Sequence, residues 1–345
     1  IAPRQRGRAP LSKVFYADNG SSGVEVALKM AFHWFRNRGD QPKRTRFVTL
    51  RNSYHGETVG ALSVGDIPLY RRVYAPLLLS PLFAPSPDAW DALPGESPEQ
   101  CAHRAADALA DLLEAHAGEV CALILEPLVQ CAGGMRMHHP AYLARARALC
   151  DAHGVHLILD EIAVGFGRTG TLFACEQAGI APDLLCLSKG ITGGFMPLSA
   201  VLATQAIYDG FLDDSRERAF LHSHSYTGNP IACAAALASL DIFRDDGVIA
   251  RNRATGDAMG ALACEVAGHP NVIGRQTGMV VAFEMVADRA TRAPFPAADR
   301  RGLRAYRAAI ARGVVLRPLG DVLYWMPPYC IDAEGLEVLA RVTRE

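Results

Sequence analysis

Short apolar runs alternate with amphipathic stretches along most of this chain, and the alternation predicts strands connected by helices. The predicted strands are Val14–Ala17, Phe47–Leu50, Val120–Leu125, Val155–Leu159 and Leu184–Leu187. Most of these runs contain hardly any polar residue, which is typical of strands buried on both faces of a parallel sheet. We therefore expect an α/β fold in which helices cover a mainly parallel sheet.

Helical periodicity fills the stretches between these runs. The predicted helices are Val24–Arg38, Ala102–His116 and Ala141–His153. Ser22 and Glu25 have the spacing of a capping box at the start of the first helix, and Gly39 supplies a stop at its end. The stretch Pro81–Glu99 is rich in proline and serine, so we predict a loop there.

The pattern changes at about Asp241, after the alanine-rich run Ile231–Leu240. A long helical region follows, and the short strands predicted beyond it are Met279–Glu284, Val314–Arg317 and Val322–Met326. With 345 residues, the chain is long enough for two domains. We expect residues 1–240 to form a large domain and residues 241–345 a smaller C-terminal α+β domain.

Composition and charge narrow the classes of function. The chain is 50% hydrophobic and 21% charged, and its formal net charge is −1. Because neither a basic stripe nor an acidic tail dominates, we expect no nucleic-acid and no membrane partner. No apolar run approaches the roughly 20 residues of a membrane-spanning helix.

Cysteine and histidine spacing indicates neither a disulfide framework nor a metal site. The nine cysteines are odd in number and form no Cys-x-x-Cys pair. They are expected to be small core side chains in a reducing cytoplasm. The histidines at 138, 139, 222 and 224 have no second cluster of ligands beside them, so we expect no metal.

Charged residues follow directly after two of the predicted strands. Asp160 and Glu161 follow one, and Lys189 follows the other after a single serine. Most such charges are solvated strand ends. A partly desolvated lysine, however, has a lowered pKa and a nucleophilic amine that forms Schiff bases. With an aspartate nearby to hold a protonated pyridine nitrogen, the pair is typical of a pyridoxal-phosphate site.

Other residues add to this hypothesis. Gly20 and Ser21 lie directly before a predicted helix, where free N–H groups and the helix dipole favour a phosphate, although an ordinary helix cap is the alternative. Tyr54 follows a strand end and has a ring that can stack on a cofactor. Glycines in the segment Gly165–Gly170 and after Lys189 allow close approach of the backbone to a ligand.

Several motifs together carry a resemblance to a known family. They are DNGSSGVEVALKMA, RNSYHGETVGALSVG, LILEPLVQCAGGMRMH, LILDEIAVGFGRTGTLFACE, LSKGITGG, HSHSYTGNPIACAAAL and RPLGDVLYWMPPY. With them the chain resembles the class III (fold-type I) pyridoxal-phosphate aminotransferases from about Val14 to Tyr329. The resemblance implies a fold-type I large domain with a mainly parallel sheet, a transaminase activity, and pyridoxal 5'-phosphate as cofactor.

The resemblance also implies roles for single residues. Lys189 and Asp160 would be catalytic: the lysine binds the cofactor and moves a proton, and the aspartate holds the pyridine nitrogen. Ser225 would reach the phosphate bound by a neighbouring subunit, which implies a homodimer with shared active sites. The implied cofactor-binding residues are Gly20, Ser21, Tyr54, Asp160, Lys189 and Ser225.

Substrate contacts are implied in the same way. Arg317 would hold a substrate carboxylate through a bidentate pair. Glu126 is expected to lie close to the site, but no role is assigned to it. No catalytic role is assigned to His55 either. The implied substrate-binding residues are Tyr54, Arg168, Ser223, Arg317 and Tyr324.

A narrower resemblance concerns the substrates. The segment around Gly133 and the final Met-Pro-Pro-Tyr resemble the biotin-synthesis branch of the family. This branch implies 8-amino-7-oxononanoate as amine acceptor, 7,8-diaminononanoate as product and S-adenosylmethionine as amine donor, with lysine as an alternative donor. The glutamate of the ornithine and GABA branches is missing from the stretch Cys131–Gly134.

Two other functions stay open from the sequence. One is another class III aminotransferase that acts on an ω-amino acid with pyruvate or 2-oxoglutarate, and the other is a catalytically silent protein that binds the cofactor. Members of the resembled family also carry a further segment before the position of Val14, with aromatic residues of the substrate pocket. We expect this chain to be a fragment without that segment, and its second-substrate pocket to be incomplete.

Overall fold

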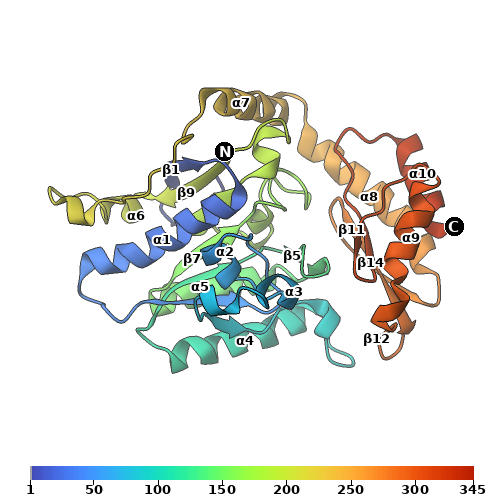
Figure 1. Cartoon of the computed structure of the whole chain (residues 1–345), viewed down its shortest axis with the longest axis horizontal. Coiled ribbons are helices and arrows are strands. Elements are labelled where there is room, and N and C mark those ends of the chain that lie inside the picture. The colour runs from blue at the N-terminus through green and yellow to red at the C-terminus, as the bar shows by residue number, and fades with distance from the viewer. Residues whose placement is uncertain (1) are drawn as a thin grey trace. The chain divides into compact units, whose positions relative to one another are not determined.

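The computed structural model describes residues 2–345, and the chain divides into two compact units (Figure 1). The first unit contains the residues up to Phe166 together with Phe173–Ile242. The second contains Phe243–Glu345 and the short segment Gly167–Leu172. Each unit has its own sheet and its own core, and the two are described separately below.

The first unit is built on one sheet with the strand order β1-β9-β8-β7-β4-β2-β3. Neighbouring strands from β3 to β8 pair in parallel, whereas β9 pairs antiparallel with both β8 and β1. The predicted α/β fold with a mainly parallel sheet is therefore confirmed. The strands are β1 (Leu11–Ala17), β2 (Arg46–Leu50), β3 (Leu82–Ala84), β4 (Val120–Leu125), β7 (His156–Asp160), β8 (Leu184–Leu187) and β9 (Ser199–Thr204), and a separate hairpin pairs β5 (Val129–Gln130) with β6 (Arg136–Met137).

Two strands of this sheet were not predicted. β3 lies inside the stretch that the proline and serine residues indicated as loop, so that prediction was wrong for Leu82–Ala84. β9 consists largely of alanine, serine and threonine and gives no continuous apolar run. Both strands form because neighbours offer hydrogen-bonding edges, and such pairing depends on residues far away in the sequence.

Helices cover this sheet. The main ones are α1 (Gly20–Arg38), α4 (Pro98–Ala115) and α5 (Ala141–His153), and shorter ones are α2 (Val59–Ser63), α3 (Pro68–Arg71) and α6 (Gln205–Asp209). A further helix, α7 (Pro230–Asp245), is largely exposed and buries only Ala232 and Ala236. α4 begins inside the stretch predicted as loop, with a capping box formed by Ser97 and Gln100. α1 buries one apolar face in the core of the unit, which brings about 1.5–3 kcal/mol per large side chain. The buried residues of that face include Val24, Ala27, Leu28, Ala31 and Phe35.

The predicted capping box of the first helix was wrong. α1 already begins at Gly20, and the side chain of Asn19 accepts the N–H of Ser22 at 2.9 Å as its cap. The carboxylate of Glu25 turns to α2 instead and accepts the backbone N–H groups of Gly60 at 2.7 Å and Ala61 at 3.1 Å. The predicted stop is confirmed, because Gly39 ends the helix in the left-handed conformation with φ 72°.

The second unit contains an antiparallel sheet and helices, drawn in orange to red in Figure 1. The predicted strand Val314–Arg317 was wrong: Val315 and Arg317 are exposed there, and the short strand follows at Pro318–Leu319. The elements are α8 (Val248–Ala267), β10 (Val272–Thr277), β11 (Val280–Asp288), β12 (Ala293–Pro294), α9 (Arg301–Ile310), β13 (Pro318–Leu319), β14 (Val322–Trp325) and α10 (Ala333–Arg344). Its core includes Met259, Phe283, Trp325 and Ala340.

The cysteines lie mostly in the first unit. Buried ones are Cys101, Cys121, Cys150, Cys175 and Cys186, and none of the described cysteines forms a disulfide. Within residues 2–345, no helix has the length and apolar character needed to cross a bilayer. The same residues contain no group of three or more histidine, cysteine or acidic side chains placed to hold a metal.

Candidate active site

The candidate site lies at the edge of the first sheet where its parallel strands end. The order β8-β7-β4-β2 places four carboxyl ends side by side. Lys189 follows β8, Asp160 ends β7, Glu126 follows β4, and Tyr54 comes after β2. Ligands of parallel α/β sheets bind beyond this edge of the sheet.

Asp160 is held by a histidine to which sequence reasoning gave no role. The Oδ2 atom of Asp160 is 2.8 Å from Nδ1 of His55, and its Oδ1 atom accepts the N–H of Ile162 at 3.1 Å. Asp160 is 5% exposed and His55 is 2% exposed. Among the described residues, Nε2 of His55 is buried without a partner. The aspartate is therefore fixed in one orientation.

Glu126 supports the loops that surround this pair. Its carboxylate accepts the backbone N–H of Tyr54 at 2.9 Å and that of Cys131 at 3.1 Å. Burial raises the pKa of Glu126 to about 7, and the charge of Asp160 adds to this effect while His55 opposes it. The glutamate thus ties the chain that leaves β2 to the loop that follows β4.

Lys189 differs from the expectation of partial burial. Its side chain is exposed, because the chain turns away from the sheet directly after β8 with φ 43° at the lysine. Such a left-handed conformation is uncommon for a residue with a side chain and marks local backbone strain. Gly190 follows where a Cβ would lie 3.0 Å from the side chain of Phe166, so a larger residue after the lysine would need that side chain to shift.

The start of α1 packs against the end of β7. A Cβ on Gly20 would lie 3.1 Å from the side chain of Ile162, two residues after Asp160. The hydroxyl of Ser21 accepts the N–H of Glu57 at 3.1 Å, and Gly56 approaches the same serine with φ 123°. The first N–H groups of the helix have no acceptors within it. They lie beside the chain that leaves β2.

Tyr54 is half-buried in this neighbourhood. Its hydroxyl donates to Oε1 of Glu57 at 3.0 Å, and its ring centroid is 5.5 Å from that of Tyr70. Burial raises the pKa of the Tyr54 hydroxyl, and the negative charges of Glu57 and Asp160 add to the effect. The ring is thus held between a hydrogen bond and a neighbouring aromatic side chain.

Ser223 and Ser225 lie on an exposed segment. His224, between them, places its Nε2 atom 3.0 Å from Oδ1 of Asp18, which lies just before α1. No described contact joins either serine to Asp160 or Lys189. The segment is therefore tied to the start of α1, and a direct role of the serines in this chain's own site stays a prediction.

Three of the predicted substrate-binding residues belong to the second unit. Arg168 donates to the carbonyl of Pro327 at 2.7 Å, and its guanidinium lies 4.3 Å from the ring centroid of Tyr329. These contacts give Arg168 a part in holding its own unit together. Arg317 is exposed just before β13, and Tyr324 lies in β14 opposite Ala282.

The residues of the first unit fit a pyridoxal-phosphate site. A buried aspartate with a fixed orientation suits a protonated ring nitrogen. The start of α1, with Gly20 and Ser21, offers unpaired N–H groups to a phosphate. The amine of Lys189 is exposed at the neighbouring strand end, and Tyr54 offers a ring for stacking.

A second buried carboxylate, Glu161, gives this region a pH dependence. It is 0% exposed and accepts the backbone N–H groups of Ala174 at 2.7 Å and Cys175 at 2.9 Å. Burial raises its pKa from 4.5 to about 7. A raised pKa favours folding below the unfolded value and loses that contribution as pH rises through the folded value.

We expect Glu161→Gln to remove part of this pH dependence. The free energy of unfolding of the unmodified chain should fall by up to about 3 kcal/mol between pH 4.5 and 7 through this group, and the neutral amide should not show that fall. Urea unfolding across this pH range measures the difference. The exposed Glu114→Gln is the control, and parallel curves for the chain and Glu161→Gln would contradict the assignment.

Comparisons with known proteins agree with this geometry. A family model described as aminotransferase class-III matches residues 5–342. The chain is 45% identical over 350 residues to adenosylmethionine-8-amino-7-oxononanoate aminotransferase of Nitratidesulfovibrio vulgaris, which covers 100% of this chain and 64% of that protein. It is 46% identical to the protein of the same name from Geobacter sulfurreducens, over 98% of this chain and 76% of that one. The chain thus spans less than two thirds of the first relative.

Solved structures of aminotransferases also superpose closely on this chain. The crystal structure of adenosylmethionine-8-amino-7-oxononanoate aminotransferase from Methanocaldococcus jannaschii superposes with a TM-score of 0.89 at 35% identity, over 96% of this chain and 74% of that one. An amine transaminase from an uncultivated Pseudomonas species, solved in its PLP-bound form, superposes with a TM-score of 0.90 at 34% identity, over 96% of this chain and 76% of that one.

Proposed function

This chain belongs to the class-III aminotransferase family, whose members depend on pyridoxal 5'-phosphate, and we propose that it transfers an amino group to 8-amino-7-oxononanoate to give 7,8-diaminononanoate. The relatives from Nitratidesulfovibrio and Geobacter are named for that acceptor and for adenosylmethionine. We therefore propose S-adenosylmethionine as the amine donor. The single observation that carries the proposal is the identity of 45–46% to these relatives over nearly the whole chain.

The bound cofactor supplies an aldehyde that reacts with amines and a ring that takes up electron density from the substrate carbon. Asp160, oriented by His55, keeps a proton on the ring nitrogen. The Nζ atom of Lys189 would attach the cofactor, and the same amine would take and return the proton of the substrate carbon. The first N–H groups of α1, at Gly20 and Ser21, hold the phosphate, and the ring of Tyr54 orients the cofactor.

Arg317 is the proposed anchor for a substrate carboxylate in the second unit. Its side chain is exposed and lies just before β13. A guanidinium binds a carboxylate through two parallel hydrogen bonds, which gives orientation as well as affinity. Tyr324 on β14, and Arg168 with Ser223, are proposed to line the substrate pocket.

We expect Arg317→Gln to raise the KM for 8-amino-7-oxononanoate by about 10- to 100-fold, because a hydrogen bond to a charged group contributes about 1.5–3 kcal/mol. The dissociation constant of the cofactor should stay within a factor of two. Steady-state kinetics and cofactor titration measure the two quantities. Exposed Arg312→Gln in the same unit is the control, and an equal loss of cofactor affinity in Arg317→Gln would contradict the substrate role.

We also propose a homodimer with shared sites in the cytoplasm. α7 and the segment before it carry large apolar side chains that are exposed in the single chain, and these suit an interface between two copies. They are Leu221, Tyr226, Ile231, Leu237 and Ile242. In such a dimer Ser225 would bind the phosphate of the other copy. The free cysteines suit a reducing compartment.

The choice of substrates is tested by half-reactions with the cofactor-loaded chain. S-adenosylmethionine, lysine and an ω-amino acid are each added alone, and the change in the cofactor's visible absorbance is followed. We expect S-adenosylmethionine to convert the cofactor to its amine form, and 8-amino-7-oxononanoate to reverse the change. Conversion only by the ω-amino acid, with reversal by pyruvate or 2-oxoglutarate, would instead assign another class III activity, and no conversion by any donor would indicate a silent binding protein.

A further inference from the structure

A cavity of about 270 Å³ lies at the opposite edge of the first sheet, away from the candidate active site. It is bounded by the C-terminal end of α1, the loop after α1, the helix α5 and the residues that precede β7 and β8. Its lining includes charged and aromatic side chains: Arg8, Arg38, Arg44, Arg147, Asp151, Asp183, Trp34, Phe35 and His156. No residue that ends a strand at the candidate active site belongs to it.

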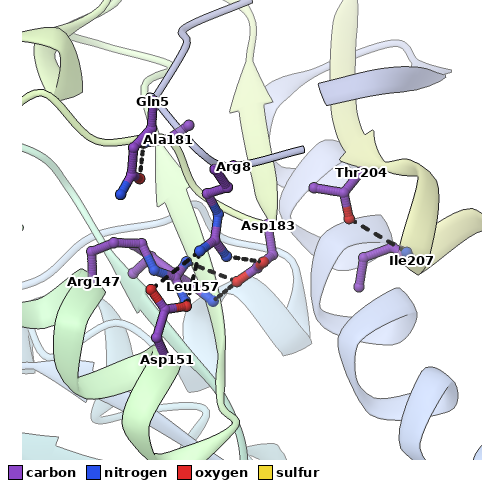
Figure 2. A network of polar contacts seen from close by, with 9 residues as sticks. All are labelled: Gln5, Arg8, Arg147, Asp151, Leu157, Ala181, Asp183, Thr204 and Ile207. Atoms are coloured by element: carbon purple, nitrogen blue, oxygen red, sulfur yellow. Dashed lines mark hydrogen bonds and ion pairs between the residues drawn. The ribbon is translucent and has the colours of Figure 1, made fainter. Parts of the chain in front are cut away.

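Four of these side chains form a closed ring of ion pairs, shown in Figure 2. Arg147 bonds to Asp183 and to Asp151, both at 2.8 Å. Arg8, from the segment before β1, bonds to the same two aspartates. Asp183 also accepts the backbone N–H of Leu157 at 2.8 Å. Two positive and two negative charges balance within the ring, so it leaves no net charge in the cavity wall.

The positive charge of Arg44 is not balanced by an ion pair. Arg38 has a partner, because it pairs with Asp40 at 2.8 Å. Arg44 is 8% exposed, and no carboxylate among the described residues pairs with it. Its guanidinium donates to Gln41, to the carbonyl of Val120 at 2.8 Å and to that of His153 at 2.8 Å.

These three contacts leave two N–H groups of Arg44 unused, one on each terminal nitrogen. A guanidinium can offer N–H groups from both terminal nitrogens to one carboxylate in bidentate fashion. Burial lowers the pKa of His156 to about 4, so the imidazole is neutral at pH 7 and adds no charge. The cavity wall therefore carries one uncompensated positive charge.

Three buried nitrogen atoms of the lining also have no partner among the described residues. They are Nε of Arg8, Nε of Arg147 and Nε2 of His156. Each of these atoms is closed off from solvent, so none of them is placed to contact a ligand in the cavity, and the ligand contact is assigned to Arg44.

The remaining wall is aromatic. The ring of His156 lies 4.7 Å from that of Trp34 and 5.0 Å from that of Phe35, measured between centroids. An inorganic ion would leave this wall and most of the volume without contact. A ligand with an apolar body would fill both, because close packing against aromatic faces is favourable.

From these observations we propose that the cavity binds a small organic monocarboxylate with an aromatic or alicyclic body. The single unbalanced charge of Arg44 matches one negative charge, its two unused N–H groups match two carboxylate oxygens, and the aromatic wall matches the body. A phosphate dianion would bring two charges against one. The site is separate from the proposed aminotransferase site and does not depend on that function.

The proposal is tested by calorimetric titration of the chain with benzoate, with acetate and inorganic phosphate as comparison ligands at constant ionic strength. We expect benzoate to bind with one site per chain and at least tenfold more tightly than either comparison ligand. Arg44→Gln should weaken benzoate binding at least tenfold. Arg36→Gln, on the exposed face of the same helix region, should leave it unchanged.

Two further variants keep the result unambiguous. Arg44→Lys keeps the charge but loses the planar pair of N–H groups, so it should fold and still bind benzoate several-fold more weakly. Arg317→Gln should retain the site, which separates it from a carboxylate pocket in the second unit. Absence of saturable benzoate binding, equal affinity in folded Arg44→Lys and the unmodified chain, loss of the site in Arg317→Gln, or tighter binding of phosphate would each overturn the proposal.

Discussion

Replacement of Lys189 by alanine is expected to lower the transamination rate by at least about 10⁴-fold, the upper end of what a positioned acid–base group contributes. The chain has only three other lysines, and none follows a strand at the candidate site: Lys13, Lys29 and Lys43. Lys13 lies over the ring of Tyr208 at 4.4 Å, and Lys29 lies 3.0 Å from His222. No other lysine amine follows a strand at the candidate site, so none is placed to replace Lys189 in the reaction.

Two measurements separate the loss of chemistry from a loss of fold. The visible absorbance that marks the cofactor attached to a lysine should disappear in Lys189→Ala, while circular dichroism should stay unchanged because the side chain is exposed. Exposed Lys43→Ala should keep both the absorbance and the rate. Turnover within tenfold of the unmodified chain in Lys189→Ala, with the absorbance intact, would remove this lysine from the mechanism.

The strands that carry the site could be predicted because their signal is local. β4 and β8 begin and end where the apolar runs do, since a strand buried on both faces has to be apolar at every position. β9 could not be predicted in this way. Its small side chains become a strand because β8 and β1 pair with its two edges.

The sequence predicted the positions of individual site residues only in part. Asp160 and Lys189 stood out because each follows a buried apolar run and glycine-rich segments lie close to both in the sequence. The partner of Asp160 did not, because His55 lies 105 residues earlier and the two meet only because β2 and β7 end at the same edge of the sheet, with β4 between them. The exposure of Lys189 likewise follows from a backbone turn with positive φ, which no propensity of lysine predicts.

Asp160→Asn is expected to lower the rate of transamination by about 10²–10³-fold, comparable to the loss of one preorganised electrostatic contact. The amide has nearly the shape of the carboxylate, and its oxygen still accepts the N–H of Ile162. The amide has no negative charge that would keep a proton on a ring nitrogen. Its NH₂ group also gives His55 a hydrogen-bond donor where the carboxylate gives an acceptor. The loss should therefore be in kcat, with the fold and the phosphate contacts retained.

Glu161→Gln is the matched control, because it neutralises the next carboxylate in the chain, which is also buried but bonds to Ala174 and Cys175 rather than to His55. Comparing kcat and cofactor affinity at pH 6, where both variants are expected to fold, isolates the charge at Asp160. If that charge acts on the ring nitrogen, His55 affects the rate by positioning the aspartate. His55→Gln should then lower kcat strongly in the unmodified chain and much less in a chain that already carries Asp160→Asn. Equal kcat for Asp160→Asn and Glu161→Gln would contradict that role, because each variant removes one buried carboxylate and only Asp160 belongs to the proposed cofactor site.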